Sequence, residues 1–138
     1  MKTIKKYVTW SEKETILTAE KLSTQFNGNE VVLLSGDLGA GKTVFTKGIA
    51  LGLGLKDINQ VCSPSYTILN IYKAKFDIYH FDFYRLSLRE TKELGWEDYL
   101  DRGIIVVEWG EKMDYKGQAL RIMIEIGKEE ERIIEVRS

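Results

Sequence analysis

The stretch GDLGAGKT, from Gly36 to Thr43, has the spacing of a phosphate-binding loop, G-x-x-x-x-G-K-[ST]. Its glycines let the backbone curl so that successive N–H groups point at phosphate oxygens. Lys42 supplies a mobile positive charge for the outer phosphates, and Thr43 offers a hydroxyl to magnesium. A helix that begins here also directs the positive end of its dipole at the anion. These residues predict a site for a nucleoside triphosphate and Mg²⁺.

The loop has the neighbours that this geometry requires. VVLLSG, Val31 to Gly36, is a short apolar run with β-branched residues, typical of a strand that is buried on both faces. TVFTKGIALGLGL, Thr43 to Leu55, has apolar residues near helical spacing and glycines toward its end. We expect the nucleotide to contact Asp37, Leu38, Gly39, Ala40, Gly41, Lys42, Thr43 and Val44.

Two acids follow apolar runs elsewhere in the chain. Glu108 comes directly after IIVV, and Asp82 comes directly after IYHF. In open α/β sheets, ligands bind beyond the carboxyl ends of the strands, so acids at such ends can reach the phosphates or the metal. We expect Glu108 to serve magnesium with Thr43, directly or through water, and Asp82 to serve either the metal or the attacking water. With Lys42, these acids are the predicted catalytic residues.

Three further residues have two interpretations each, and one has a single expected role. His80 lies two residues before Asp82, on the same face of a strand, where a histidine is either packed and hydrogen-bonded or catalytic. Arg85 either senses phosphate or forms a salt bridge on the following helix. Cys62 is the only cysteine, which excludes an internal disulfide, and we expect it to be a small buried apolar residue. Trp109, directly after Glu108, either packs in the core or belongs to a partner surface.

The segment SPSYT, Ser63 to Thr67, is a polar loop that contains the only proline. Hydroxyl groups in such a loop can contact the terminal phosphate and so order the loop. Ser65 and Thr67 are therefore candidates for a switch or a partner contact. The alternative is a solvated turn.

The whole chain has 138 residues, 43% of them hydrophobic, a formal net charge of −1 and a pI near 5.9. This length and composition predict one globular domain over residues 1–138. The absence of a positive charge excess means that RNA binding would need a local patch or a partner. MKTIKKYVTW lacks the apolar segment of a signal peptide, and no run approaches the length of a membrane span.

The hydrophobic pattern alternates between strands and helices early and predicts antiparallel strands late. A capping box, Ser11 with Glu14, starts the first helix. The expected fold is α/β: a three-layer sandwich like that of P-loop NTPases, with a mixed, mainly parallel central sheet and a C-terminal antiparallel hairpin. Besides the loop's own strand and helix, we expect a strand over 3–10, a helix over 11–26, two strands that meet through a turn near 73–75, a helix over 85–100, a strand over 103–109 and a hairpin over 121–138.

Four motifs in this order, GDLGAGKT, SPSYTI, HFDFYRL and VEWGE, resemble the TsaE family, over nearly the whole chain. The family consists of small P-loop ATPases that act in making threonylcarbamoyladenosine in tRNA. The resemblance implies a cytoplasmic, Mg²⁺-dependent ATPase that works with the TsaB and TsaD proteins and meets tRNA indirectly, through their complex. Its ATP hydrolysis would support multiple rounds of modification of adenosine 37, without transferring the threonylcarbamoyl group itself.

The resemblance also bears on single residues. It assigns Lys42 to the phosphates, Thr43 and Glu108 to magnesium, and Asp82 to an acid that the family needs. Trp109 matches the tryptophan that follows the metal acid. At position 65 the family usually has threonine, and serine keeps the hydroxyl but loses the methyl group that restricts χ1.

Two other classes of protein use a phosphate-binding loop at this size, and a third interpretation differs only in degree. A small-molecule kinase needs an acceptor pocket and usually an arginine-rich lid, whereas the arginines here are scattered. A GTP switch normally carries N-K-x-D, which this sequence lacks. A nucleotide-gated interaction module with little turnover stays open. With no arginine finger evident near the loop, we expect slow hydrolysis in the absence of partners.

Overall fold

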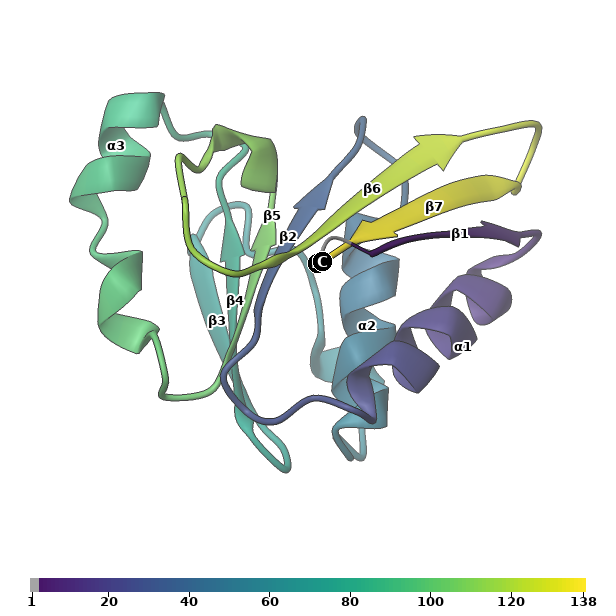
Figure 1. Cartoon of the computed structure of the whole chain (residues 1–138), viewed down its shortest axis with the longest axis horizontal. Coiled ribbons are helices and arrows are strands. Elements are labelled where there is room, and N and C mark those ends of the chain that lie inside the picture. The colour runs from purple at the N-terminus through teal and green to yellow at the C-terminus, as the bar shows by residue number, and fades with distance from the viewer. Residues whose placement is uncertain (1–2) are drawn as a thin grey trace.

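The computed structural model describes residues 3–138, which form a seven-stranded mixed sheet with helices on both faces (Figure 1). The strands are β1 (Ile4–Thr9), β2 (Val31–Ser35), β3 (Leu69–Lys73), β4 (Asp77–Asp82), β5 (Ile104–Glu108), β6 (Leu120–Ile126) and β7 (Arg132–Arg137). Their order is β1-β7-β6-β2-β5-β4-β3. The central pairs β6–β2, β2–β5 and β5–β4 are parallel, and the pairs β1–β7, β7–β6 and β4–β3 are antiparallel. The predicted α/β fold with a parallel sheet centre and a C-terminal antiparallel hairpin is confirmed.

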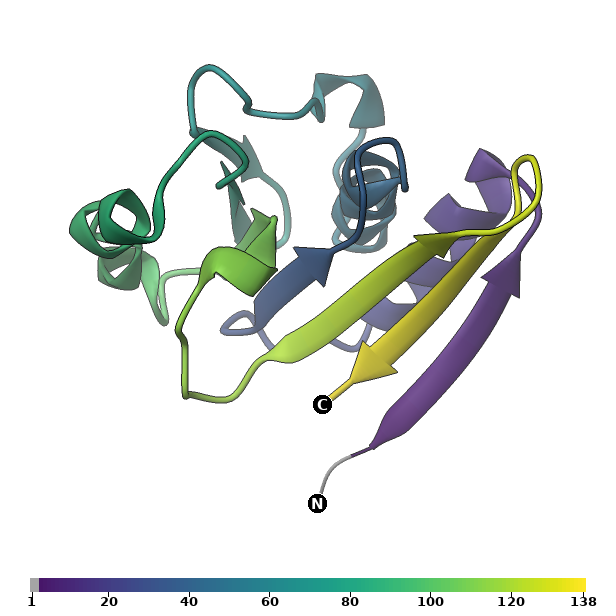
Figure 2. The same ribbon diagram turned by 90° about the horizontal axis from the view of Figure 1, so that it is seen from above.

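The helices divide between the two faces of the sheet (Figure 2). They are α1 (Glu12–Ser23), α2 (Lys42–Gly52) and α3 (Leu88–Glu93), with the 3-10 turns η1 (Ile58–Gln60), η2 (Trp96–Tyr99) and η3 (Gly110–Lys112). Along β2, Val32 and Leu34 pack in the core beneath α1 and α2, whereas Val31 and Leu33 pack in a second core with Trp96. Burial on both sides explains why the VVLL run shows no alternation. Within residues 3–138, no helix is long and apolar enough to cross a membrane.

Two helices differ from the sequence-based expectation, one in its bounds and one in the hydrogen bonds at its start. The helix expected over 85–100 is two shorter elements, α3 and η2, separated at Gly95, whose φ is +78°. The start of α3 is set by Ser87 and Glu90, which cap each other's backbone N–H groups. In α1, the Ser11 hydroxyl accepts from the Glu14 N–H as expected, but the Glu14 carboxylate accepts from the N–H of Trp10.

The parallel strands end at the same edge of the sheet and bring distant residues together. In the β4–β5 pair, Asp82 lies opposite Glu108, and in the β2–β5 pair, Leu34 lies opposite Glu108. The loop that follows β2 therefore begins beside both acids. This edge of the sheet carries the candidate site.

Candidate nucleotide-binding site

A cleft of about 510 Å³ opens at the carboxyl ends of β2, β4 and β5. Its volume lies within the range of about 300–1,000 Å³ that is typical of small-molecule sites. Its lining includes residues 38–44 of the predicted phosphate loop, together with Asp82 and Glu108. Asp37, also predicted as a nucleotide contact, is not among the residues that line the cleft.

The loop between β2 and α2 has the backbone that an anion site needs. Gly36 has a φ of +147°, and a Cβ at this position would collide with the carbonyl oxygen of Ile124. Gly41 precedes α2 in a left-handed conformation, and in the described chain no side chain caps this helix. The first N–H groups of α2 therefore remain available to a phosphate, at the positive end of the helix dipole.

Lys42 lies at the floor of the cleft, with its residue only 5% exposed. Its ammonium donates to the carbonyls of Gly36 and Asp37, at 2.6 and 2.9 Å, and lies 4.2 Å from the centroid of the Trp109 ring. Burial lowers the pKa of Lys42, and nearby carboxylates, Glu108 foremost, act in the opposite direction. Trp109 reaches this position in a left-handed conformation with a φ of +63°.

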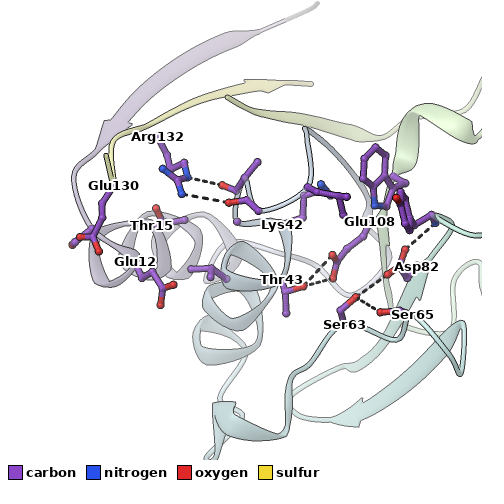
Figure 3. A pocket seen from close by; sticks show the side chains of 18 of the residues that line it. Glu12, Thr15, Lys42, Thr43, Ser63, Ser65, Asp82, Glu108, Glu130 and Arg132 are labelled. Carbon is purple, nitrogen blue, oxygen red and sulfur yellow. Dashed lines mark hydrogen bonds between the residues drawn. The ribbon is translucent and has the colours of Figure 1, made fainter. Parts of the chain in front are cut away.

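Thr43 and Glu108 form a pair at the start of α2 (Figure 3). The Thr43 hydroxyl lies 3.0 and 2.9 Å from the two carboxylate oxygens of Glu108, whose residue is 4% exposed. A hydroxyl and a carboxylate are the hard oxygen ligands that Mg²⁺ prefers, and Mg²⁺ usually takes one or two of these together with phosphate and water. The structure also contains no group of three or more His, Cys, Asp or Glu side chains arranged for a metal within residues 3–138. The hydroxyl and the carboxylate of this pair have the donor chemistry that Mg²⁺ prefers.

Asp82, on the strand beside Glu108, is held from two sides. Ser63 donates its hydroxyl to one carboxylate oxygen at 2.7 Å, and the backbone N–H of Tyr84 donates to the other at 2.9 Å. Ser65 lies 3.1 Å from Ser63, hydroxyl to hydroxyl (Figure 3). The aspartate thus connects the strand end to the 63–67 loop.

The remaining predicted residues divide between the cleft and its surroundings. Arg85 lines the cleft, and its guanidinium carbon lies over the Tyr66 ring, 4.3 Å from the ring centroid. It forms no ion pair among residues 3–138. Thr67 is exposed and donates to Asn70, away from the cleft. His80 is fully buried beside Glu108, 2.6 Å away. Cys62 is exposed, so the prediction that it is buried is wrong: it begins a surface loop.

The other end of the cleft is formed by segments far from the phosphate loop in sequence. Ser11, Glu12 and Thr15 come from the start of α1, and Glu130 and Arg132 come from the β6–β7 hairpin. Figure 3 shows Glu12, Thr15, Glu130 and Arg132 on one side of Lys42 and Thr43, with Asp82, Ser63 and Ser65 on the other. The cleft is therefore elongated, with the phosphate loop between its two ends.

Arg132 joins the hairpin to the phosphate loop. Its guanidinium donates to the carbonyls of Ala40 and Gly39, at 2.9 and 3.3 Å, and to the carbonyls of Glu129 and Glu131. These bonds tie the β6–β7 hairpin to the backbone of the phosphate loop at Gly39 and Ala40. Arg132 acts here on the backbone of the loop.

Comparison with known proteins identifies the family. The profile of one family, described as Threonylcarbamoyl adenosine biosynthesis protein TsaE, matches residues 9–134. The chain belongs to the TsaE family. A Bacillus subtilis protein, tRNA threonylcarbamoyladenosine biosynthesis protein TsaE, is 37% identical over 133 residues, which cover 94% of this chain and 82% of the relative. A Rickettsia prowazekii protein of the same name is 45% identical over 103 residues, 73% of this chain and 71% of the relative.

A solved structure agrees with this assignment. The crystal structure of Bacillus subtilis YdiB matches with a TM-score of 0.80 at 32% identity, and the match covers 100% of this chain and 87% of that chain. The TsaE resemblance predicted from the four sequence motifs is therefore confirmed.

In this TsaE-family chain, sequence reasoning missed the residues that act through the loop backbone or by long-range contact. Ser63 holds Asp82 and Arg132 holds the phosphate loop, yet neither was predicted. The signal for Ser63 was present, since SPSYT was identified as a hydroxyl-bearing loop. Nothing in the sequence placed Arg132 beside a loop that lies 92 residues earlier.

Proposed function

We propose that this TsaE-family protein binds and hydrolyses ATP with Mg²⁺ in the machinery that makes N6-threonylcarbamoyladenosine at position 37 of tRNA. In this role it supports repeated turnover by a TsaB–TsaD complex, meets tRNA through that complex, and works in the cytoplasm. Residues 1–138 act as a single P-loop ATPase domain. Lys42 binds the outer phosphates, Thr43 and Glu108 serve magnesium, and Asp82 orients water or assists the metal.

The observation that carries the proposal is the contact between Thr43 and Glu108. It places an acid from the end of β5 against the hydroxyl that begins the phosphate-loop helix, within 3.0 Å. In P-loop NTPases a serine or threonine of this loop and an acid at a strand end serve the Mg²⁺ that neutralises the phosphates. Asp82 lies opposite Glu108 on the neighbouring strand, close enough in register to act on the same phosphates.

The charges that line the cleft support slow hydrolysis by the protein alone. Among the described residues, the positive side chains that line it are Lys42, Arg85 and Arg132. Arg132 is engaged with backbone carbonyls, and Arg85 stacks on Tyr66. Of these three, Lys42 sits at the start of α2, so we expect residues 3–138 to leave the transition state without an arginine fixed at the phosphates. A partner that supplies such a charge raises hydrolysis rates by about 10³–10⁵.

The first test is ATP turnover by the purified protein, alone and then with TsaB, TsaD and tRNA. We expect slow turnover alone and an increase of about 10³ or more with the partners, because they complete the charge around the phosphates. Phosphate transfer to a small metabolite would instead indicate a kinase. Tight ATP binding without turnover under any of these conditions would indicate a nucleotide-gated interaction module.

Replacing Arg132 with methionine is expected to weaken ATP binding about 10-fold. Hydrogen bonds to a charged group are worth about 1.5–3 kcal/mol, and the loss of those to Ala40 and Gly39 removes a restraint on the backbone of the phosphate loop. Titration calorimetry with ATP measures the change. The control is Arg121→Met. Arg121 lies on β6, donates to the carbonyl of Tyr115 and does not line the cleft. Equal affinity in both variants would show that Arg132 does not support the loop.

A further inference from the structure

A chain of buried hydrogen bonds runs from Glu108 to the backbone of the loop after η1. The Glu108 carboxylate lies 2.6 Å from Nε2 of His80, and Nδ1 of His80 lies 3.0 Å from the hydroxyl of Tyr72. That hydroxyl in turn donates to the carbonyl of Cys62 at 3.3 Å. His80 is fully buried, and Tyr72 and Glu108 are each 4% exposed. Neither His80 nor Tyr72 has a role in the proposed hydrolysis.

The Cys62 carbonyl is the backbone end of this chain of hydrogen bonds. A carbonyl oxygen only accepts, so the single hydroxyl proton of Tyr72 points at Cys62. Nδ1 of the His80 ring lies 3.0 Å from the same hydroxyl oxygen, within hydrogen-bond distance. Nε2, on the other side of the ring, lies 2.6 Å from the Glu108 carboxylate. The imidazole ring is therefore oriented by Tyr72 on one side and orients Glu108 on the other.

The same stretch of loop also reaches the second acid. Ser63, the residue after Cys62, donates its hydroxyl to Asp82 at 2.7 Å (Figure 3). His80 and Asp82 lie on the same face of β4, two residues apart. Two adjacent loop residues thus hold both acids, Ser63 directly and Cys62 through Tyr72 and His80. The loop continues to Tyr66, which is 84% exposed.

We propose that Tyr72 and His80 are positioning residues for Glu108, which transmit the placement of the Cys62–Ser63 backbone to the acid that serves magnesium. This inference rests on the proposed function, because it takes Glu108 to be the magnesium acid. Partners behind a metal ligand fix its orientation, and their loss typically costs about 10–100-fold in metal affinity or activity. When a phosphate or a protein partner displaces the loop, the bond from Tyr72 to Cys62 changes and Glu108 loses its fixed orientation.

The test uses a variant for each bond. Tyr72→Phe removes one hydroxyl and keeps the ring, so it cuts the chain with little change in packing. His80→Gln keeps an amide near the position of Nε2 for Glu108 but breaks the hydrogen bond to Tyr72. His80→Asn keeps an amide near the position of Nδ1 for Tyr72 but breaks the hydrogen bond to Glu108. Tyr79→Phe is the matched control, because Tyr79 precedes His80 on β4 and, within residues 3–138, its hydroxyl donates only to Asp77, at 3.5 Å.

Two measurements separate positioning from stability. The first is the MgCl₂ concentration that half-activates ATP turnover, with kcat and KM determined separately. The second is the gain in affinity for a non-hydrolysable ATP analogue when MgCl₂ is added, measured by calorimetry. We expect Tyr72→Phe to raise the half-activating Mg²⁺ concentration about 10-fold and His80→Asn up to about 100-fold. The analogue's affinity without Mg²⁺ should stay within about twofold of wild type, since neither residue lies at the phosphate loop.

The double variant Tyr72→Phe/His80→Gln gives the sharpest result. Both single changes break the same bond, so the double variant should need no more Mg²⁺ than the worse single variant. A normal Mg²⁺ response in Tyr72→Phe, or one equal to that of Tyr79→Phe, would overturn the inference. A wild-type protein whose affinity for the analogue is indifferent to Mg²⁺ would overturn the proposed function instead, and would do so before any variant is compared.

Discussion

Lys42→Met is expected to weaken ATP binding by at least about 100-fold without unfolding the protein. The ammonium lies at the start of α2, where a phosphate would replace the carbonyls of Gly36 and Asp37 as its partner. A charge-assisted hydrogen bond contributes about 1.5–3 kcal/mol, and the ammonium faces more than one phosphate oxygen. Calorimetry or displacement of a fluorescent ATP analogue measures the loss.

Stability should respond in a different way from binding. Because burial lowers the pKa of Lys42, the protonated side chain is less favourable in the folded protein than in the unfolded chain at any pH below its usual value of 10.5. Methionine removes this cost and keeps most of the apolar stem, so the melting temperature should not fall by more than a few degrees. Lys47→Met is the control, since it removes the same charge from the same helix outside the cleft lining. ATP binding by Lys42→Met that equals binding by Lys47→Met would refute the phosphate-binding role.

The parts of the site that could be predicted are those set by local sequence or by strand direction. GDLGAGKT specifies its own loop, because glycine positions and the following helix are local properties. Glu108 and Asp82 could be found because acids at the ends of parallel strands meet at one edge, and the β4–β5 register places them opposite each other. Neither inference required knowledge of which elements pack together.

The parts that could not be predicted depend on tertiary contacts. Arg132 reaches Ala40 only because the β6–β7 hairpin lies beside β2 in the sheet, and a sequence pattern does not give strand order. In the 63–67 loop, the choice between Ser63, Ser65 and Thr67 depends on loop conformation, and Thr67 turns toward Asn70. The wrong bounds of the helix expected over 85–100 have a local cause instead. Gly95 takes a positive φ, which interrupts the helix between α3 and η2.

Glu108→Gln is expected to lower Mg²⁺-dependent ATP turnover by at least about 100-fold, with a much smaller effect on ATP binding in the absence of Mg²⁺. Glutamine keeps the shape of the side chain and an oxygen for Thr43, but it removes the negative charge that draws the metal. Loss of a residue that only supports a metal ligand typically lowers metal affinity or activity about 10–100-fold, so loss of the ligand itself should lower turnover at least as much. The measurement is kcat and KM over a range of MgCl₂ concentrations, beside analogue affinity with and without MgCl₂.

The control for charge alone is Glu111→Gln. Glu111 lies three residues further on, is exposed, and acts on Lys42 only through its charge, without lining the cleft. A general loss of negative charge would affect both variants alike, whereas a lost metal ligand affects only the change at Glu108. Normal Mg²⁺-dependent hydrolysis by Glu108→Gln would mean that another residue binds the metal. Asp82, which lines the same cleft and accepts hydrogen bonds from Ser63 and Tyr84, would then be the next acid to replace.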